Sequence, residues 1–309
     1  MGEVVSGEEL AALLGISRVA LKKRVDRMVE RGIPIEAVER KGYRLLEIPD
    51  TPLEEVVLSL LDTEVVGSRF IFYPVVDSTN RVARELAREG CPEGTVVVAD
   101  KQTAGRGRLG RRWFSPEGRN LYFSVVLRPR ISPTYLYHAT MLAAVSVCEA
   151  LRNRGIDALI KWPNDVYVRG RKICGVLNEA ELSGSRAEFV VLGVGVNVNI
   201  ESGEFPPDVR DIATSLFEET GERHKRSELL AEILSSMDRW YKKLRRGDVW
   251  ELFSFWRRNN YLIGRRIEVD GRLKGDAVGI TPLGELIVRV EDGSITTVAA
   301  GDIKLLEKT

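Results

Sequence analysis

The chain has 309 residues, of which 44% are hydrophobic and 29% are charged, and its formal net charge is +1. The length fits two or three domains, and the composition is that of a globular protein with a sizeable core. Because the total charge is near zero, the chain is not basic throughout, and any binding of nucleic acid or phosphate must come from local clusters.

The cysteines and histidines are few and scattered. Cys91, Cys148 and Cys174 form no close pair, and the only histidines are His138 and His224. Neither a disulfide framework nor a zinc site is therefore expected. Such cysteine usage is typical of a reducing compartment, and no signal segment or apolar run of roughly 18 residues is seen. A cytoplasmic location without a membrane is expected.

Residues 1–49 predict a winged helix-turn-helix. SGEELAALLG predicts a short helix capped by Ser6, SRVALKKRVDRMVERG predicts a second, and a hairpin with Lys41-Gly42 near its turn follows. Few residues precede Ser6, so the leading helix usual in such domains is expected to be missing. A helical hairpin with a solvated charged face is the alternative. In the winged-helix interpretation, the candidate DNA-binding residues are Ser17, Arg18, Lys22, Lys23, Arg27, Lys41 and Arg44.

The rest of the chain predicts a mixed α/β segment and a small β unit. Breaker residues at 49–52 predict a linker. Strands are predicted at 70–76, 94–100 and 120–129, with three more between 157 and 200, and helices at 132–155 and from 227 to about 261. Successive strands without intervening helices favour antiparallel pairing in a mixed sheet over a doubly wound sheet. Four short strands at the end are enough for a small β-barrel.

The stretch GRGRLGRR (105–112) has the glycine spacing of a dinucleotide-binding turn. That turn requires a helix beginning at the glycines and an acidic residue about 20 positions later. Here Pro116 and Gly118 break any helix, and after Glu117 no acidic residue occurs until Glu149. The dinucleotide interpretation is therefore rejected. Alternating arginines and glycines can clamp phosphate oxygens, and a disordered basic loop is the alternative.

Three further motifs contain a lysine at the end of a predicted strand or glycines inside one. In KWPND, Lys161 ends an apolar run before a turn, so its ammonium can stabilise charge on a phosphorus or carboxyl oxygen. An exposed lysine at a hairpin turn is the alternative. In KICGVLNE and GVGVNVN, Gly175, Gly193 and Gly195 interrupt β-branched strands, which indicates close approach of a ligand or another backbone. Sheet packing is favoured for Gly195.

The motifs are more specific in combination. DSTN (77–80), which caps a predicted helix and also suits a polar ligand, is followed by KQTAGRGRLGRRWFSP, KWPND, KICGVLNE and GVGVNVN. This order closely resembles the biotin protein ligase family over essentially the whole chain, and the N-terminal residues resemble its bifunctional members, which also repress biotin-synthesis genes. The resemblance implies an α+β fold: a winged helix-turn-helix (1–49), a mixed-sheet catalytic domain of class II synthetase type (53–260) and an SH3-like barrel (261–309).

The resemblance also implies site residues. The catalytic residues would be Lys161, Arg106 and Arg108. Biotin would be bound by Ser78, Thr79, Asn80, Gln102, Gly105, Arg106, Gly107, Arg108, Lys161, Gly175 and Gly193. ATP or the adenylate would be bound by Arg108, Arg111, Trp113, Asn164, Lys172, Asn197, Asn199 and Ile212. Mg²⁺ would be carried by ATP, and no protein ligand for it is certain.

The family reaction has two steps. The biotin carboxylate attacks the α-phosphorus of ATP to give biotinyl-5′-AMP and pyrophosphate, and a lysine of the biotin carboxyl carrier protein then displaces AMP. No covalent enzyme intermediate is required, in keeping with a chain that has no evident Ser-His or Cys-His pair. The implied partners are the carrier protein, an operator DNA and a second copy of the chain. A ligand-responsive regulator without ligase activity and a lipoate ligase, whose arginine-serine-glycine motif is missing, are the alternatives.

Overall fold

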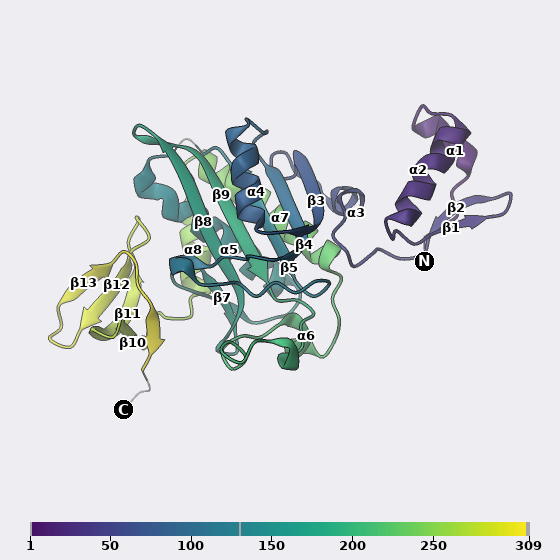
Figure 1. Cartoon of the computed structure of the whole chain (residues 1–309). Helices are drawn as coiled ribbons and strands as arrows, with labels where there is room; N and C mark the ends of the chain where they lie inside the picture. Colours follow the sequence, from purple (N-terminus) through teal and green to yellow (C-terminus); the bar gives the residue numbers. More distant parts are fainter. Residues whose placement is uncertain (1, 130, 307–309) are drawn as a thin grey trace.

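The computed structural model describes residues 2–129 and 131–306 (Figure 1). In chain order it has a helix pair with a two-stranded wing, a seven-stranded sheet covered by helices, and a five-stranded antiparallel sheet. This arrangement confirms the predicted α+β fold class. Within the described ranges, no helix has the length and apolar character needed to cross a membrane.

The N-terminal part contains α1 (Gly7–Leu13), α2 (Arg18–Glu30), β1 (Ile35–Val38) and β2 (Gly42–Leu45). Ser6 and Ser17 cap the two helices by accepting hydrogen bonds from backbone amides, so each helix begins at the residue that follows its serine. The residues before α1 run extended along the wing, where Val5 pairs with Tyr43. The small core lies between the helices and the wing, so the wing closes it on one side.

The central sheet has the strand order β3-β4-β5-β9-β8-β7-β6. Its strands are β3 (Arg69–Val76), β4 (Thr95–Gln102), β5 (Leu121–Leu127), β6 (Ala158–Lys161), β7 (Asp165–Val168), β8 (Arg171–Ser183) and β9 (Arg186–Val196). Only β3 and β4 pair in parallel, because α4 (Thr79–Arg88) connects them, and the other pairs are antiparallel as predicted. The strand β7 was not predicted, since it is short and begins inside the polar turn of KWPND.

Helices cover both faces of this sheet (Figure 1). On one face α4 packs against β4, β5 and β9, and on the other α5 (Leu136–Asn153) packs against β8 and against α7 (Arg226–Arg245). Alternation along β4 divides its side chains between these layers: Val96 and Val98 join the large core, and Val97 joins the core beneath α4. The shorter helices are α3 (Glu54–Leu60), α6 (Leu216–Thr220) and α8 (Trp250–Arg258).

Two predicted segments differ in detail. The long helix expected to start at 132 begins with a short 3₁₀ turn, and α5 itself starts at Leu136. The helical stretch expected from 227 to about 261 is two helices, because Gly247 adopts a φ of 77° that ends the first one.

The C-terminal sheet has five strands where four were predicted. They are β10 (Arg266–Val269), β11 (Leu273–Ile280), β12 (Leu286–Val290), β13 (Ile295–Val298) and β14 (Ile303–Leu305). The additional strand, β14, returns to pair with β10. This sheet shares a core with the central part, and the Trp162 indole donates to the Gly284 carbonyl at 2.8 Å. It therefore sits directly beside the end of β6.

Candidate active site

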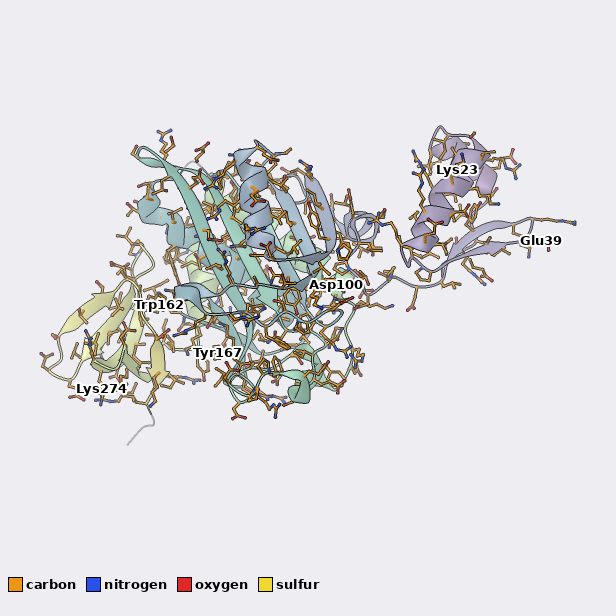
Figure 2. The ribbon with its side chains drawn as sticks, in the orientation of Figure 1. Lys23, Glu39, Asp100, Trp162, Tyr167 and Lys274 are labelled. Atoms are coloured by element: carbon orange, nitrogen blue, oxygen red, sulfur yellow. The ribbon has the colours of Figure 1, made fainter. Side chains whose placement is uncertain are left out.

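One cavity of about 1210 Å³ lies where β4, β6, β8 and β9 meet the C-terminal sheet. Its other walls are the segments 103–117, 205–213 and 301–303. Every residue predicted to bind biotin lines this cavity, and so does every residue predicted to bind ATP except Asn199. Figure 2 marks Trp162 and Tyr167 on the side of the central sheet that faces the C-terminal sheet. Residues as far apart in the sequence as Ser78 and Ile303 are thus brought to one place.

The arginine–glycine loop, residues 105–113, forms a narrow hairpin over this cavity. The Trp113 amide donates to the Gly105 carbonyl at 3.0 Å, and the Gly107 amide donates to the Arg111 carbonyl at 2.7 Å. A side chain at Gly105 would place its Cβ 2.5 Å from the Trp113 carbonyl oxygen, so only glycine lets the hairpin close. The loop contains a 3₁₀ turn at Arg108–Gly110 and is followed by β5, so the helix that a dinucleotide site needs does not begin at these glycines.

The loop contacts both the KWPND turn and the C-terminal sheet. Arg108 donates to the side-chain oxygen of Asn164 at 3.1 Å, while the Asn164 amide group donates to the Val176 carbonyl. Arg111 forms an ion pair with Asp302, which no sequence motif had indicated. Two motifs that stand apart in the sequence are therefore joined by direct side-chain contacts.

Two lysines of the cavity, Lys161 and Lys172, lie near the Asp165 carboxylate. The Lys161 ammonium lies 4.8 Å from the centre of the Tyr167 ring, and Lys172 pairs with Asp165 at 2.8 Å and lies 5.3 Å from the centre of the Trp113 ring. Burial lowers the pKa of Lys161, and the nearby Asp165 carboxylate opposes part of that change. The cationic side chains that line the cavity outnumber its carboxylates, so the site is net positive and suits a ligand with several negative oxygens.

The strand glycines make room for the side chains above them. A Cβ at Gly193 would come within 1.9 Å of the Asn80 side-chain oxygen, and one at Gly195 within 2.4 Å of the Trp113 indole nitrogen. At Gly175 it would meet the Trp113 ring at 3.0 Å. The packing role favoured for Gly195 is incomplete, because this glycine lines the cavity and lies against Trp113.

A buried chain of hydrogen bonds supports the DSTN turn. The Thr79 amide donates to the Gln102 side-chain oxygen at 2.9 Å, and the Ser124 hydroxyl contacts both Thr79 and Asn80 at 2.8 and 2.7 Å. Gln102 thus satisfies an amide at the start of α4, and the Ser78 side chain makes no capping bond. N-capping therefore does not explain the serine, which leaves its hydroxyl free for a ligand.

The structure brings in two residues that were not among the predicted site residues. Glu179 accepts from the Asn80 amide at 2.8 Å, and Ser115 accepts from Gln102 at 3.0 Å. Both residues fall inside the motifs KICGVLNE and KQTAGRGRLGRRWFSP, but nothing in those motifs indicated which side chains they contact. The Trp113 indole nitrogen is buried and has no hydrogen-bond partner among the described residues, which indicates an acceptor supplied by a ligand.

The residues predicted to contact the adenine do not all lie in the cavity. Asn199 is buried outside the cavity, where its side chain exchanges hydrogen bonds with the backbone of His224, so its geometry gives no support to adenine contact. Asn197 donates to the Thr214 carbonyl at 3.0 Å and lines the cavity. Ile212 also lines it and is 61% exposed, as a residue that covers an open site would be.

The acidic residues do not form a metal site of their own. Within residues 2–129 and 131–306, no group of three or more His, Cys, Asp or Glu side chains could hold an ion. Asp165 is already paired with Lys172.

The residues predicted to bind DNA lie on the N-terminal helix pair and its wing. Arg18, Lys22, Lys23, Arg27 and Lys41 are all exposed. Ser17 is occupied as the cap of α2. Arg44 pairs with Glu36 across the wing, which reduces its charge toward DNA.

Comparisons with known proteins agree with this arrangement. The biotin/lipoate A/B protein ligase family matches residues 72–197, an HTH domain matches 1–44, and the biotin protein ligase C-terminal domain matches 262–306. The bifunctional ligase/repressor BirA of Bacillus subtilis (strain 168) is 38% identical over 309 residues, 98% of this chain and 94% of its own length. That of Escherichia coli (strain K12) is 30% identical, with the same coverage of both chains.

Among solved structures, the biotin protein ligase from Aquifex aeolicus in complex with biotin and ATP matches with a TM-score of 0.66. It is 34% identical, and the match covers 78% of this chain and 100% of that chain. The predicted resemblance and enzyme class are confirmed. Because relatives of at least 30% identity cover nearly the whole chain and the three domain matches follow in order, the chain belongs to the biotin protein ligase family, in its bifunctional ligase/repressor branch.

Proposed function

We propose that the cavity binds biotin and ATP together, forms biotinyl-5′-AMP, and then transfers biotin to a lysine of the carrier protein of a biotin-dependent carboxylase. The observation that carries this proposal is the convergence of the arginine–glycine loop, KWPND and the strand glycines on one cavity. Its volume of about 1210 Å³ exceeds the roughly 300–1000 Å³ of common small-molecule sites, as two substrates would require.

Biotin binding is assigned to the DSTN side of the cavity. The free hydroxyl of Ser78 and the polar chain through Thr79 and Gln102 suit the ureido group, because donors and acceptors are held there by buried partners. The backbone at Gly175 and Gly193 leaves space for an apolar tail along the strands. The carboxylate of that tail would then lie near the two lysines.

In the first step, a biotin carboxylate oxygen forms a bond to the α-phosphorus of ATP, and the bond from that phosphorus to the bridging oxygen of pyrophosphate breaks. Lys161, Lys172 and Arg108 carry the positive charge that this step needs, from three different elements around the cavity. Fixed charges in a partly dehydrated site stabilise the developing negative charge without reorganising. The protein's part is thus orientation and charge neutralisation.

In the second step, the acceptor lysine amine attacks the carbonyl carbon of the mixed anhydride. An amide bond forms, AMP leaves with the electron pair of the broken carbon–oxygen bond, and the amine loses a proton to solvent. The anhydride must survive until the acceptor arrives, and the hairpin of the arginine–glycine loop is placed to keep water away. The contact from Arg108 to Asn164 would hold it there.

We also propose the DNA, the dimer and the metal as partners. The chain would bind operator DNA as a homodimer loaded with the adenylate, through the exposed basic residues of α2. Mg²⁺ would enter with ATP. The three cysteines are free and buried, which supports a reducing compartment such as the cytoplasm.

The decisive experiment measures biotin-dependent exchange of labelled pyrophosphate into ATP, followed by transfer of biotin to a purified carrier domain. Exchange only with biotin, and then labelled carrier, is expected. Lipoate in place of biotin should support neither reaction. A chain that binds biotin but shows no exchange and no transfer would be a regulator without ligase activity, and the proposal would fail.

A further inference from the structure

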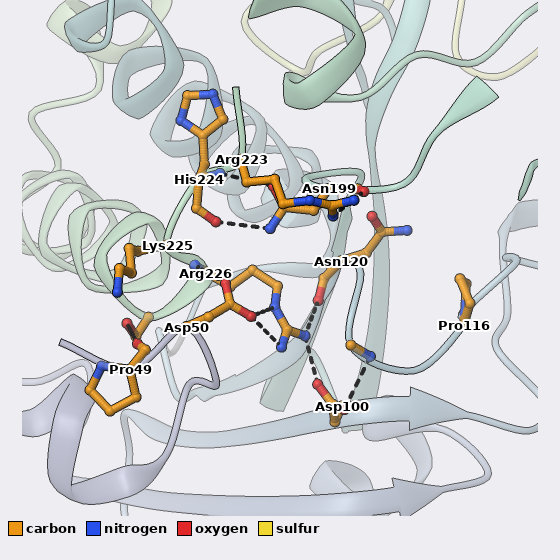
Figure 3. A network of polar contacts seen from close by, with 12 residues as sticks. Pro49, Asp50, Asp100, Pro116, Asn120, Asn199, Arg223, His224, Lys225 and Arg226 are labelled. Atoms are coloured by element: carbon orange, nitrogen blue, oxygen red, sulfur yellow. Dashed lines mark hydrogen bonds and ion pairs between the residues drawn. The ribbon is translucent and has the colours of Figure 1, made fainter. Parts of the chain in front are cut away.

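Arg226 joins the linker that follows the winged helix to the wall of the cavity. It is the first residue of α7, and its side chain is 2% exposed although it carries a full charge. Figure 3 shows the carboxylates of Asp50 and Asp100 on two sides of its guanidinium. A buried charge requires such partners, and the loss of one partner strongly destabilises the others.

On the linker side, Asp50 receives two hydrogen bonds from Arg226. One oxygen accepts from the guanidinium Nε at 2.6 Å, and the other accepts from the backbone amide at 2.9 Å. The N-cap residue of α7, Lys225, makes no capping bond with its own side chain, so the linker carboxylate takes that role. The Ser227 amide adds a bond to the Asp50 carbonyl at 3.0 Å. The linker is therefore fixed to the start of α7.

On the cavity side, the same guanidinium donates to Asp100 at 2.6 Å and to the Asn120 carbonyl at 3.3 Å. The second Asp100 oxygen accepts from the Gly118 amide at 3.1 Å, where the chain returns from the arginine–glycine loop. Asp100 also lies two residues before Gln102 on β4. Arg226 thus contacts the linker directly and reaches the end of the ligand loop through Asp100.

We infer that Arg226 is a positioning residue through which occupancy of the cavity sets the orientation of the winged helix. The inference rests on the proposed binding of biotin and ATP. When the loop and the end of β4 adjust to ligand, Asp100 and Gly118 shift, and Arg226 follows because its buried charge must keep its partners. Asp50 is attached to the same guanidinium, so the linker follows in turn. Coupling of this kind is reciprocal, and DNA on the winged helix tightens ligand binding by the same factor.

The test is hydrogen exchange of the full chain with and without biotin plus ATP, read on peptides that contain the linker and the arginine–glycine loop. In the unaltered protein, ligand should slow exchange in both, by about fivefold or more in the linker. Asp50→Asn replaces an accepting oxygen with a donor facing the guanidinium, so the linker should lose its response while the loop keeps it. Asp62→Asn, an exposed carboxylate on the chain beyond α3, is the matched control and should behave as the unaltered protein does.

Protection of the loop without any response of the linker in the unaltered protein would overturn the inference, and so would a linker response that survives Asp50→Asn. Absence of loop protection would instead overturn the proposed binding of biotin and ATP, and the inference with it. A second readout is the ratio of DNA affinities with and without ligand, on the DNA upstream of the protein's own biotin genes. Asp50→Asn should lower that ratio about fivefold or more while pyrophosphate exchange stays unchanged.

Discussion

Arg108 and Asn164 are joined by a hydrogen bond of 3.1 Å that connects the arginine–glycine loop to the KWPND turn. Asn164 is itself held by the Val176 carbonyl at 2.6 Å, so the loop is attached to the sheet at a defined point. Under the proposed function, Arg108 would therefore both supply charge to the adenylate and hold the loop in place.

Arg108→Ala should therefore raise leakage of the adenylate more than it slows adenylate formation. The loop loses its contact with Asn164, so water reaches the anhydride. Release and hydrolysis of labelled biotinyl-5′-AMP without acceptor should rise about tenfold or more, and transfer per ATP consumed should fall. Arg186→Ala, on the exposed start of β9, is the control. Unchanged leakage with a slower exchange reaction would show that the residue acts through its charge alone.

Lys161→Ala should abolish most adenylate formation, with a loss of roughly 10²-fold in biotin-dependent pyrophosphate exchange. The reason is the loss of a half-buried positive charge at the end of β6. Lys274→Ala, on β11, removes an exposed lysine and should leave exchange intact. Near-normal exchange in Lys161→Ala would show that Lys161 is not needed for adenylate formation, and Lys172 would then be the candidate for that role.

The lowered pKa of Lys161 also predicts a pH dependence. Burial disfavours the ammonium, so its charge is lost at a lower pH than for an exposed lysine. The exchange rate should fall as pH rises through that pKa. In Lys161→Arg the side chain stays charged at high pH, so the remaining exchange rate should not fall as the pH rises. An identical pH profile for both proteins would contradict the assignment.

Gly193→Ala should impair biotin binding, because the added Cβ would come within 1.9 Å of the Asn80 side-chain oxygen. Asn80 must then move away from Ser124 and Glu179, which disturbs the DSTN turn. A rise in the KM for biotin of about tenfold or more is expected, corresponding to about 1.4 kcal/mol. Gly203→Ala is the matched control, since no atom lies within 4 Å of its added Cβ. Equal effects of the two substitutions would indicate loss of stability rather than of the site.

Lys22→Ala and Lys23→Ala should weaken DNA binding and leave ligase activity unchanged. Both lysines are exposed on α2, and each phosphate contact that is lost should reduce the slope of log affinity against log salt by about 1. Binding measured by fluorescence anisotropy at several salt concentrations gives this slope. Arg44→Ala should change it less, because that arginine pairs with Glu36. A slope that none of the three substitutions alters would place the DNA surface elsewhere.

Asp238→Asn should lower stability in a pH-dependent way. Burial by itself raises the pKa of Asp238, but hydrogen bonds from the amides of Val66, Val65 and Glu64, with Lys242, outweigh it and lower the pKa overall. A depressed folded pKa contributes stability above the unfolded pKa, and this is lost as pH falls through the folded value. Loss of the charged acceptor should cost about 1–3 kcal/mol at neutral pH. Urea melts of both proteins should converge in acid, and a difference that is independent of pH would contradict this.

Much of the molecule could be read from local pattern. Apolar runs along β4 and β9 predicted these strands, and the Ser6 cap predicted the first helix, because such signals act within a few residues. The order of the motifs from DSTN to GVGVNVN identified the family for the same reason: each motif is a short segment whose chemistry is visible by itself.

What the sequence alone determined was therefore most of the strands and helices, the family, and most of the residues that share the cavity. The tertiary structure decided which of these residues touch. Gln102, rather than Ser78, accepts from an amide at the start of α4, and Trp113 lies against Gly195. The Asn199 side chain points away from the cavity. It alone joined Asp50 to Asp100 through Arg226. Such contacts link residues that are tens to more than a hundred positions apart, and no local periodicity encodes them; they exist only because the strands and helices pack in one arrangement.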